Sequence, residues 1–270
     1  MKNIFIICFL TSFCSCSIIQ RRIYSPTQVN APSLQEKKDY NLSLSVSTPS
    51  GFDFNGGYAI TNRLAVIGGL YTYKNRDTEE DFSIFSPNID STLLLYKYKG
   101  FHTGAGVFIP LEQEKNSTFL SFFGIFTKGN FEMREKLHSN TIPSSSPKLN
   151  FYKSEINRWT LQGSLHFYNK IIHQTLTTRL NYVGYNNVVT DYTFTEQTSF
   201  NLPPIAYPKW STFIDFSFDT KIFFTQKQTL GLQLFGTVTG RLNTKDYNFN
   251  YYPMRLGAGF VLKPPYFNKK

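Results

Sequence analysis

The chain has little charge, few histidines, and cysteine only near one end. Of its 270 residues, 17% are charged and four are histidines. The three cysteines all precede residue 17, which excludes a scaffold held together by disulfides. Beyond the N-terminus there is no run of about 18 apolar residues, and this excludes a bundle of membrane-spanning helices.

Aromatic residues are abundant instead. The 27 Phe and 17 Tyr account for most of an aromatic fraction of 17%, and this content excludes intrinsic disorder. Lys and Arg outnumber Asp and Glu by 28 to 18, so the net charge is +10. The basic residues are scattered, and no nucleic-acid-binding motif occurs. We therefore expect no nucleic-acid partner.

The sequence lacks the short motifs of common catalytic and metal sites. The four histidines are far apart and lack the His-x-x-x-His spacing of a zinc site. The Gly-x-Ser-x-Gly turn of serine hydrolases is absent. Ser164, close to His166 in the sequence, is better explained as part of an interior lining than as a nucleophile. We expect no enzymatic activity, no cofactor and no metal site.

Residues 1–16 have the pattern of a secretory signal peptide. A short basic start is followed by the apolar stretch 4–10 and then by small residues. Cys16, preceded by a serine, fits the acylated cysteine of a bacterial lipoprotein better than Cys14 does. The sequence therefore predicts lipidation at Cys16, and the alternative is an ordinary signal peptide without a lipid.

Residues 17–39 contain two prolines and two arginines but no periodic pattern. Such a composition indicates an extended segment between structured parts. We interpret 17–39 as a tether and 40–270 as one β-barrel domain.

The period of two that marks a strand with unlike faces recurs after residue 40. It is clearest in 210–224, where Phe216 and Phe218 are separated by Ser217. In two windows, 64–73 and 117–128, both faces are apolar, and the pattern does not assign their sides. We expect ten strands, near 40–48, 52–61, 64–75, 91–109, 117–129, 151–168, 174–187, 209–225, 229–240 and 252–263.

The connections between these strands alternate between short and long. The long ones are 76–90, 130–150, 188–208 and 241–251. Short turns at one end and long loops at the other are typical of an outer-membrane barrel. In hydrocarbon every strand edge must be paired, so the sheet must close. The sequence thus predicts an all-β fold: an antiparallel up-and-down transmembrane β-barrel of about ten strands, with both termini in the periplasm.

The faces of this barrel are predicted from the same alternation. The apolar face would contact lipid and the polar face would line the interior, whereas in a soluble barrel the apolar face would form a core. We expect aromatic girdles at the membrane interfaces, formed by Tyr71, Tyr73, Tyr96, Tyr98, Tyr168, Tyr185 and Trp210.

The region before and after residue 40 resembles the opening of a Bacteroidota family of outer-membrane β-barrel lipoproteins with no established activity. The matching residues are Tyr24-Ser25-Pro26, Asn30-Ala31-Pro32, Leu34 to Asp39, and Gly57 to Val66. Lys38 replaces the family's usual glycine, and Asn62-Arg63 replaces its Asp-His. The resemblance covers about 45 residues and implies the fold and the location, but no chemistry.

The inward polar face supplies the candidate site. Its mixed charges suggest an ion-paired network that fills the lumen, because an unpaired buried charge is costly. The alternatives are a narrow solute path and a catalytic cluster. The predicted lumen network comprises Gln162, His166, Arg179, Asn181, Asp215, Asp219, Lys221, Gln233 and Arg255.

Partners are expected at two surfaces. An extracellular ligand would bind at the long loops, because loops on rigid scaffolds often have binding roles, and the favoured alternative is that these are solvated variable loops without a ligand. Outer-membrane lipid headgroups would meet basic residues at the periplasmic side, namely Arg21, Arg22, Lys263, Lys269 and Lys270. We therefore expect a lipid-anchored structural or surface-binding module. The alternatives are a narrow pore for small solutes and a periplasmic, lipid-tethered soluble β-barrel.

Overall fold

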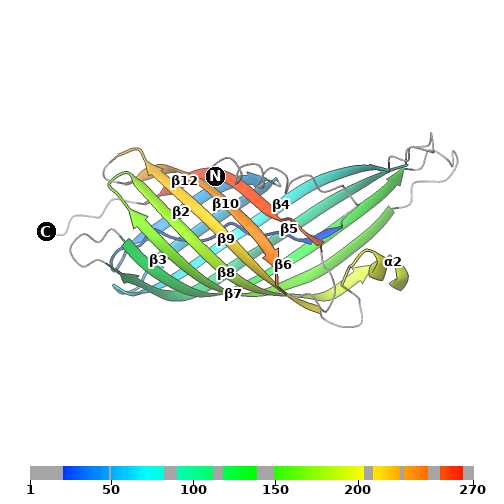
Figure 1. The fold of residues 1–270 in the computed structure, drawn as a ribbon, viewed down its shortest axis with the longest axis horizontal. Coiled ribbons are helices and arrows are strands. Elements are labelled where there is room, and N and C mark those ends of the chain that lie inside the picture. The colour runs from blue at the N-terminus through cyan, green and yellow to red at the C-terminus, as the bar shows by residue number, and fades with distance from the viewer. Residues whose placement is uncertain are drawn as a thin grey trace, which may run out of the picture.

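The computed structural model describes residues 21–48, 50–81, 90–111, 118–138, 149–203, 209–225, 228–242 and 250–263. Ten strands form one closed barrel in which all neighbouring strands are antiparallel (Figure 1). β12 pairs with β10 and β2 and so closes the sheet, which confirms the predicted ten-stranded up-and-down fold. The barrel strands are β2 (Tyr40–Thr48), β3 (Gly51–Ala59), β4 (Leu64–Asp81), β5 (Asp90–Pro110), β6 (Thr118–His138), β7 (Leu149–Tyr168), β8 (Ile172–Thr190), β9 (Lys209–Phe223), β10 (Leu230–Arg241) and β12 (Met254–Leu262).

Among the described residues, three short elements lie outside the barrel sheet. β1 (Arg22–Tyr24) pairs in parallel with β11 (Asn250–Tyr251). The helix α2 (Phe194–Ser199) follows β8. Thr193 and Glu196 form a capping box at its start, which satisfies backbone N–H groups that the first turn leaves free. The sequence does not reveal this helix, since a helix of six residues is too short to show a helical repeat.

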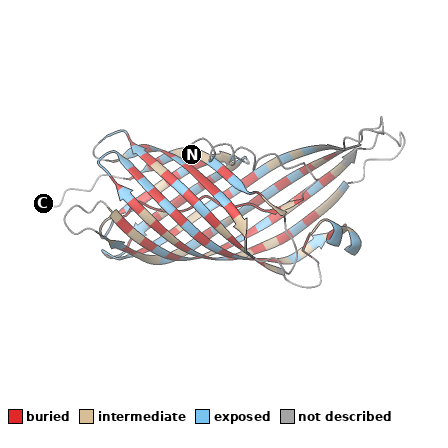
Figure 2. Cartoon of the chain, viewed as in Figure 1, coloured by how far each residue is buried: buried red, intermediate tan, exposed pale blue. Residues whose placement is uncertain are grey.

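Buried and exposed residues alternate along the barrel strands, as the chequered colouring of Figure 2 shows. Along β9, Phe216 and Phe218 are exposed on the outer surface, whereas Asp215 and Asp219 are buried. The outward face of the barrel is therefore largely apolar, whereas the interior combines buried polar side chains with two clusters of apolar and aromatic ones. In the two windows that the pattern did not assign, Ile67 on β4 and Phe123 on β6 point inward.

The predicted aromatic girdles are wrong for six of the seven residues. Tyr71, Tyr73, Tyr96, Tyr98, Tyr168 and Tyr185 are buried. The first four and Tyr185 belong to one aromatic cluster inside the barrel. Only Trp210 lies on the outer face, where it stacks on Tyr182 at a centroid distance of 4.5 Å. The tyrosines line the lumen because they occupy the inward positions of their strands.

Strands β4 to β8 are the longest of the barrel. They contain 18, 21, 21, 20 and 19 residues, compared with 15 in β9, 12 in β10 and 9 in each of β2, β3 and β12. Figure 1 shows that they extend one wall of the barrel beyond the remaining strands, on the side of α2. The predicted long loops at 76–90 and 130–150 are therefore wrong in part, because β4, β5, β6 and β7 include much of both. We call this end of the barrel the long-loop end and the opposite end the short-turn end.

Residues 21–39 are extended, as predicted, but they are not an external tether. Ile23, Tyr24, Gln28, Ser33 and Leu34 are all buried, at 3% exposure or less. The segment runs through the barrel and enters β2 at Tyr40, so the interior contains backbone as well as side chains. The rest of the predicted tether, together with the predicted signal peptide and Cys16, lies outside the described residues.

The two ends of the described chain lie at opposite ends of the barrel. Arg21 contacts Glu135, near the end of β6 at the long-loop end, whereas Lys263 contacts Asp39 at the short-turn end. The two termini, which were predicted to lie at the short-turn end, are outside the described residues, so that prediction stays open. The predicted lipid contacts of Arg21 and Lys263 are wrong, since both side chains are buried, and Arg22 lies with Arg21 at the long-loop end. Lys269 and Lys270 lie outside the described residues.

Candidate functional site

The candidate site is the barrel lumen together with the segment 21–39, which we call the plug segment. At the long-loop end, Arg21 donates hydrogen bonds of 3.0 and 2.6 Å to the Glu135 carboxylate. The guanidinium also lies 3.2 Å above the ring of Phe200. Tyr192, in the loop after β8, donates its hydroxyl to the same carboxylate. Burial, and then the neighbouring Glu135, raises the pKa of Tyr192, so its phenol stays protonated and remains a donor.

The aromatic cluster holds the next part of the plug segment. The hydroxyl of Tyr98 donates to the carbonyl oxygen of Arg22 at 2.7 Å, and that of Tyr185 donates to the carbonyl oxygen of Ile23 at 3.1 Å. The ring of Tyr24 stacks on Phe213 with centroids 4.1 Å apart. The predicted girdle tyrosines thus position the backbone of the plug segment.

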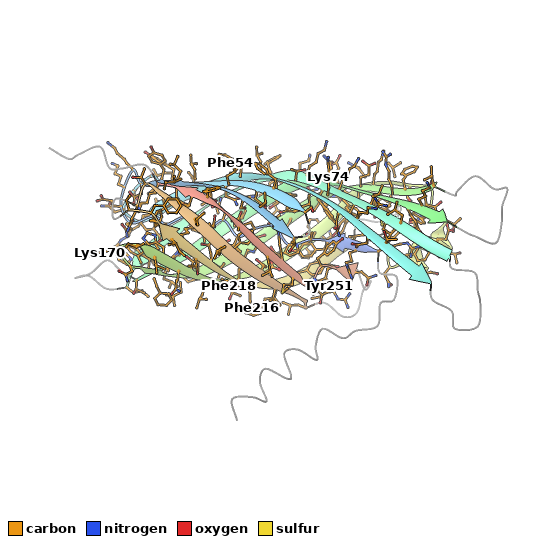
Figure 3. All side chains as sticks on the ribbon, turned by 90° about the horizontal axis from the view of Figure 1, so that it is seen from above. Phe54, Lys74, Lys170, Phe216, Phe218 and Tyr251 are labelled. Atoms are coloured by element: carbon orange, nitrogen blue, oxygen red, sulfur yellow. The ribbon has the colours of Figure 1, made fainter. Side chains whose placement is uncertain are left out.

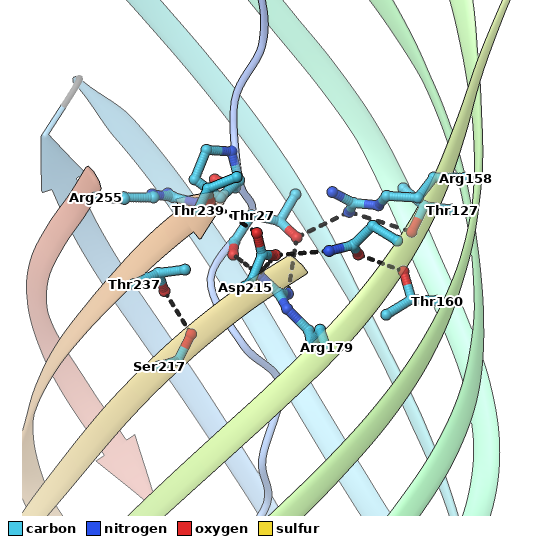
Figure 4. Close-up of polar contacts among 12 residues, drawn as sticks. Thr27, Thr127, Arg158, Thr160, Arg179, Asp215, Ser217, Thr237, Thr239 and Arg255 are labelled. Atoms are coloured by element: carbon cyan, nitrogen blue, oxygen red, sulfur yellow. Dashed lines mark hydrogen bonds and ion pairs between the residues drawn. The ribbon is translucent and has the colours of Figure 1, made fainter. Parts of the chain in front are cut away.

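Midway along the lumen, the plug segment meets a buried polar cluster centred on Thr27 (Figure 4). Arg158 donates to the Thr27 hydroxyl at 2.8 Å, and Arg179 donates to the Thr27 carbonyl oxygen at the same distance. Arg179 also forms an ion pair of 2.8 Å with Asp215. Within the part of the chain that the structure describes, Arg158 has no carboxylate within 4 Å, so hydroxyl groups are its hydrogen-bond partners.

A second ion pair lies beside this cluster. Arg255 pairs with Asp53 and donates to the carbonyl oxygen of Pro26 at 3.0 Å. The same guanidinium donates to Ser47 and Tyr73. Arg255 is 1% exposed, and its charge is neutralised where it holds the plug segment.

Towards the short-turn end, Asn30 is held from three strands. Its side-chain amide donates to the carbonyl oxygens of Gly56 and Gly68 at 2.9 and 3.0 Å. The backbone carbonyl oxygen of Asn30 accepts a hydrogen bond from the Gln162 side chain at 3.1 Å. Pro32 packs against Gly57, where a Cβ atom would lie 2.5 Å from the proline ring. This stretch therefore fits the wall by shape as well as by hydrogen bonds.

The plug segment ends in a tight turn before β2. The Asp39 carboxylate accepts from the backbone N–H of Gln35 at 2.7 Å and of Glu36 at 3.2 Å. Lys38 has a φ of 70°, in the left-handed region that favours glycine. This geometry gives a physical reason for the glycine that the resembling family has at this position.

All nine residues predicted for the lumen network are buried, at 3% exposure or less. The structure places them in several groups. Arg179 and Asn181 both donate to Asp215. Gln233 donates to Asp219, whose other oxygen lies 4.0 Å from Lys221. Gln162, His166 and Arg255 lie apart from these groups and have other partners.

His166 contacts Ser121 rather than the nearby Ser164. The Ser121 hydroxyl lies 2.8 Å from Nε2, and the Thr175 hydroxyl lies 3.1 Å from Nδ1. Both ring nitrogens are thus engaged by neutral hydroxyl groups. This arrangement joins β6, β7 and β8 inside the barrel.

Sequence reasoning missed the segment that the network binds, as well as Asp53 and Arg158. Asp53 is flanked by the outward Phe52 and Phe54, so its inward position was visible in the alternation. The plug segment has no such pattern, because polar and apolar side chains do not alternate along it.

No protein-family model matches the chain, and a search of curated proteins returns no match. The resemblance to outer-membrane lipoproteins therefore stays a prediction. Over the described ranges, no group of three or more His, Cys, Asp or Glu is placed to hold a metal ion. Among the same residues, no helix is long and apolar enough to cross a membrane. The class that the fold and the site define is a closed ten-stranded β-barrel whose lumen binds its own N-terminal segment.

Proposed function

We propose that this protein is an outer-membrane β-barrel that acts as a structural or surface-binding module and is closed by its own plug segment. The observation that carries the proposal is a charge-free outer belt, defined as the stretch of each strand whose outward side chains are uncharged. On β4 to β7 the belt spans Leu64–Thr72, Phe101–Ile109, Thr118–Phe126 and Asn157–Phe167. Each stretch is about nine to eleven residues long, and a tilted strand needs about 9–11 to cross a bilayer.

Large apolar side chains of this belt are exposed. Leu161 is 67% exposed, Leu70 is 59% and Trp159 is 57%. In Figure 3 the labelled Phe54, Phe216 and Phe218 project from the outer surface. An apolar surface that encircles a monomer in water would be an aggregation hazard, whereas lipid would cover it. This favours the membrane barrel over the soluble alternative.

The occupied lumen favours a closed barrel over the narrow pore. The plug segment fills the interior from Arg21 to Asp39 and is bound along its length. We expect the purified chain to show no steady conductance in planar bilayers, and a variant lacking residues 21–34 to conduct. Steady conductance of the intact chain would favour the pore.

Membrane insertion is tested by heat-modifiable gel migration. A folded outer-membrane barrel should migrate faster before boiling than after, and the membrane fraction should keep the protein through a carbonate wash. A chain beginning at Arg21 that is monomeric and folded in buffer without detergent would falsify the proposal.

Lipidation at Cys16 is part of the proposal and rests on the sequence pattern alone. Incorporation of a labelled fatty acid should be lost in Cys16→Ala and kept in Cys14→Ala. If neither substitution changes incorporation, the ordinary signal peptide is the better interpretation.

A further inference from the structure

The outer wall of β4 to β7 changes character above the belt, towards the long-loop end. Its described outward side chains include eight cations and two acids, Glu132 and Glu155. Figure 3 shows the labelled Lys74 on this wall, away from Lys170 at the short-turn end. We call these cations the basic wall: Lys74, Arg76, Lys97, Lys99, Lys128, Arg134, Lys136 and Lys153.

The two acids leave most of this charge uncompensated. Arg134 pairs with Glu132 at 2.5 Å, and the exposed Lys128 lies 3.9 Å from Glu155. Lys74 and Lys97 are direct cross-strand partners. Like charges placed opposite each other destabilise a sheet, so an anion bound between them would relieve the repulsion.

Among the described residues, the basic wall belongs to the long strands. Outward side chains are uncharged along Leu42–Thr48 of β2, Phe52–Tyr58 of β3, Trp210–Ile222 of β9, Leu230–Gly240 of β10 and Met254–Leu262 of β12, but β2 and β3 end near the top of the belt. The concentration of cations on four adjacent strands provides a candidate site.

A groove joins the basic wall to the belt. It has a volume of about 630 Å³ and lies on the outer surface of β3 to β7. Phe52, Leu70 and Phe101 provide an apolar side, and Lys99 and Lys128 lie at the other together with Glu155. An occupant of this groove would have its apolar part level with the belt and an anionic part level with the lysines.

We propose that the groove and the basic wall bind a phosphorylated lipid of the outer leaflet, with an acyl chain against Phe101 and Leu70 and a phosphate at Lys97, Lys99 and Lys128. This inference rests on the proposed function, since it places the belt in a bilayer with the long-loop end outward. Lysine ammonium groups bind phosphate as compact charges, and the groove admits a hydrocarbon chain beside them. A soluble acidic protein would leave the apolar side of the groove unused.

The test uses the full-length protein in detergent, with diphosphorylated lipid A as the probe and native mass spectrometry as the readout. We expect lipid A to be retained and its dephosphorylated form to be lost. Lys97→Ala combined with Lys99→Ala and Lys128→Ala should weaken retention by about tenfold or more, since each basic residue adds to the attraction. Substitution of Lys37, Lys38 and Lys170 by Ala removes the same charge at the short-turn end and should leave retention unchanged.

The outcomes separate the possible sources of binding. Equal retention of the two lipid forms, or equal loss in the two triple variants, overturns the proposal. Displacement of lipid A by millimolar inorganic phosphate would show that the lysines bind free phosphate, and this also overturns it. Each variant is first checked for heat-modifiable migration, so failure to form a membrane barrel is distinguished from failure to bind lipid.

Discussion

Lys221 on β9 donates a hydrogen bond of 2.6 Å to the backbone carbonyl oxygen of Ala31. The same mode of contact recurs where Arg255, Arg179 and Gln162 donate to the carbonyl oxygens of Pro26, Thr27 and Asn30. Buried backbone groups need partners, and this part of the plug segment belongs to no sheet. Polar side chains of the barrel supply those partners, which gives the charged interior a structural role.

Loss of the buried carboxylates should destabilise the barrel. Asp215→Ala with Asp219→Ala removes the acceptors of Arg179 and Gln233 and leaves the buried cations of Arg179 and Lys221 without a carboxylate to neutralise them, although both keep hydrogen bonds to the plug segment. We expect a loss of roughly 3–5 kcal/mol for each broken pair, seen as a lower temperature of conversion to the unfolded gel band. Glu132→Gln, on the outer wall, is the matched control and should convert at the original temperature. Unchanged conversion of the double variant would refute a structural role for the network.

Adding a single methyl group to the barrel wall should test how closely the plug segment packs against it. In Gly57→Ala the new Cβ would lie 2.5 Å from the Pro32 ring, whereas in Gly68→Ala the nearest atom is 3.5 Å away. Overpacking of this kind costs about 1–3 kcal/mol. Thermal unfolding should occur earlier in Gly57→Ala only. If the two variants unfold alike, Pro32 does not press against β3 in solution.

The contact between Arg21 and Glu135 should protect the start of the plug segment from proteolysis. Trypsin cleaves after arginine, and Arg21 is 6% exposed. Glu135→Ala removes the acceptor of both Arg21 and Tyr192. We expect trypsin to cleave after residues 21 and 22 faster in this variant than in the unsubstituted chain. Mass spectrometry of the products measures the rate. Glu155→Ala removes a carboxylate from the outer surface of β7 and should leave the rate unchanged. Equal acceleration in both variants would contradict a protective role for the contact between Arg21 and Glu135.

The turn before β2 should become more stable with glycine. Lys38 is exposed and has a φ of 70°, a conformation that costs an L-residue about 1–2 kcal/mol. Lys38→Gly should therefore raise the unfolding temperature, although the greater freedom of the unfolded chain offsets part of the gain. Lys38→Ala keeps the strain and should not raise it. A gain in the alanine variant would mean that the lysine charge, rather than the backbone, is responsible.

The orientation of the barrel can be measured with thiol labelling. Ser199, at the end of α2, is exposed at the long-loop end, and Lys170 is exposed in the turn between β7 and β8. We expect a membrane-impermeant maleimide to label Ser199→Cys in intact cells and Lys170→Cys only after permeabilisation. The unsubstituted chain gives the background from its own cysteines. The reverse pattern would place the long-loop end, and with it Arg21, in the periplasm.

The strand pattern was predictable within the belt and less so above it. Within the belt the two faces of a strand differ, so β2 begins and ends at the predicted residues 40 and 48. Above the belt, β6 extends to His138 rather than to residue 129. There the outward Glu132 and Arg134 are charged and the inward Phe131 and Met133 are apolar, so the polarity of the two faces is the reverse of that within the belt. A period of two that changes its sense along a strand is easily mistaken for the end of the strand.

The sequence alone determined the closed all-β architecture and the inward side of residues such as Asp215 and Arg255. The reason is that alternation along a strand determines on which face of the sheet each side chain lies. Tertiary structure alone decided what fills the lumen. Residues 21–39 have no periodicity of their own, and their place follows from hydrogen-bond partners that are far apart in the sequence, such as Glu135 for Arg21 and Lys221 for Ala31. The course of an unpaired segment is set by the surface that surrounds it, and that surface exists only once the barrel has closed.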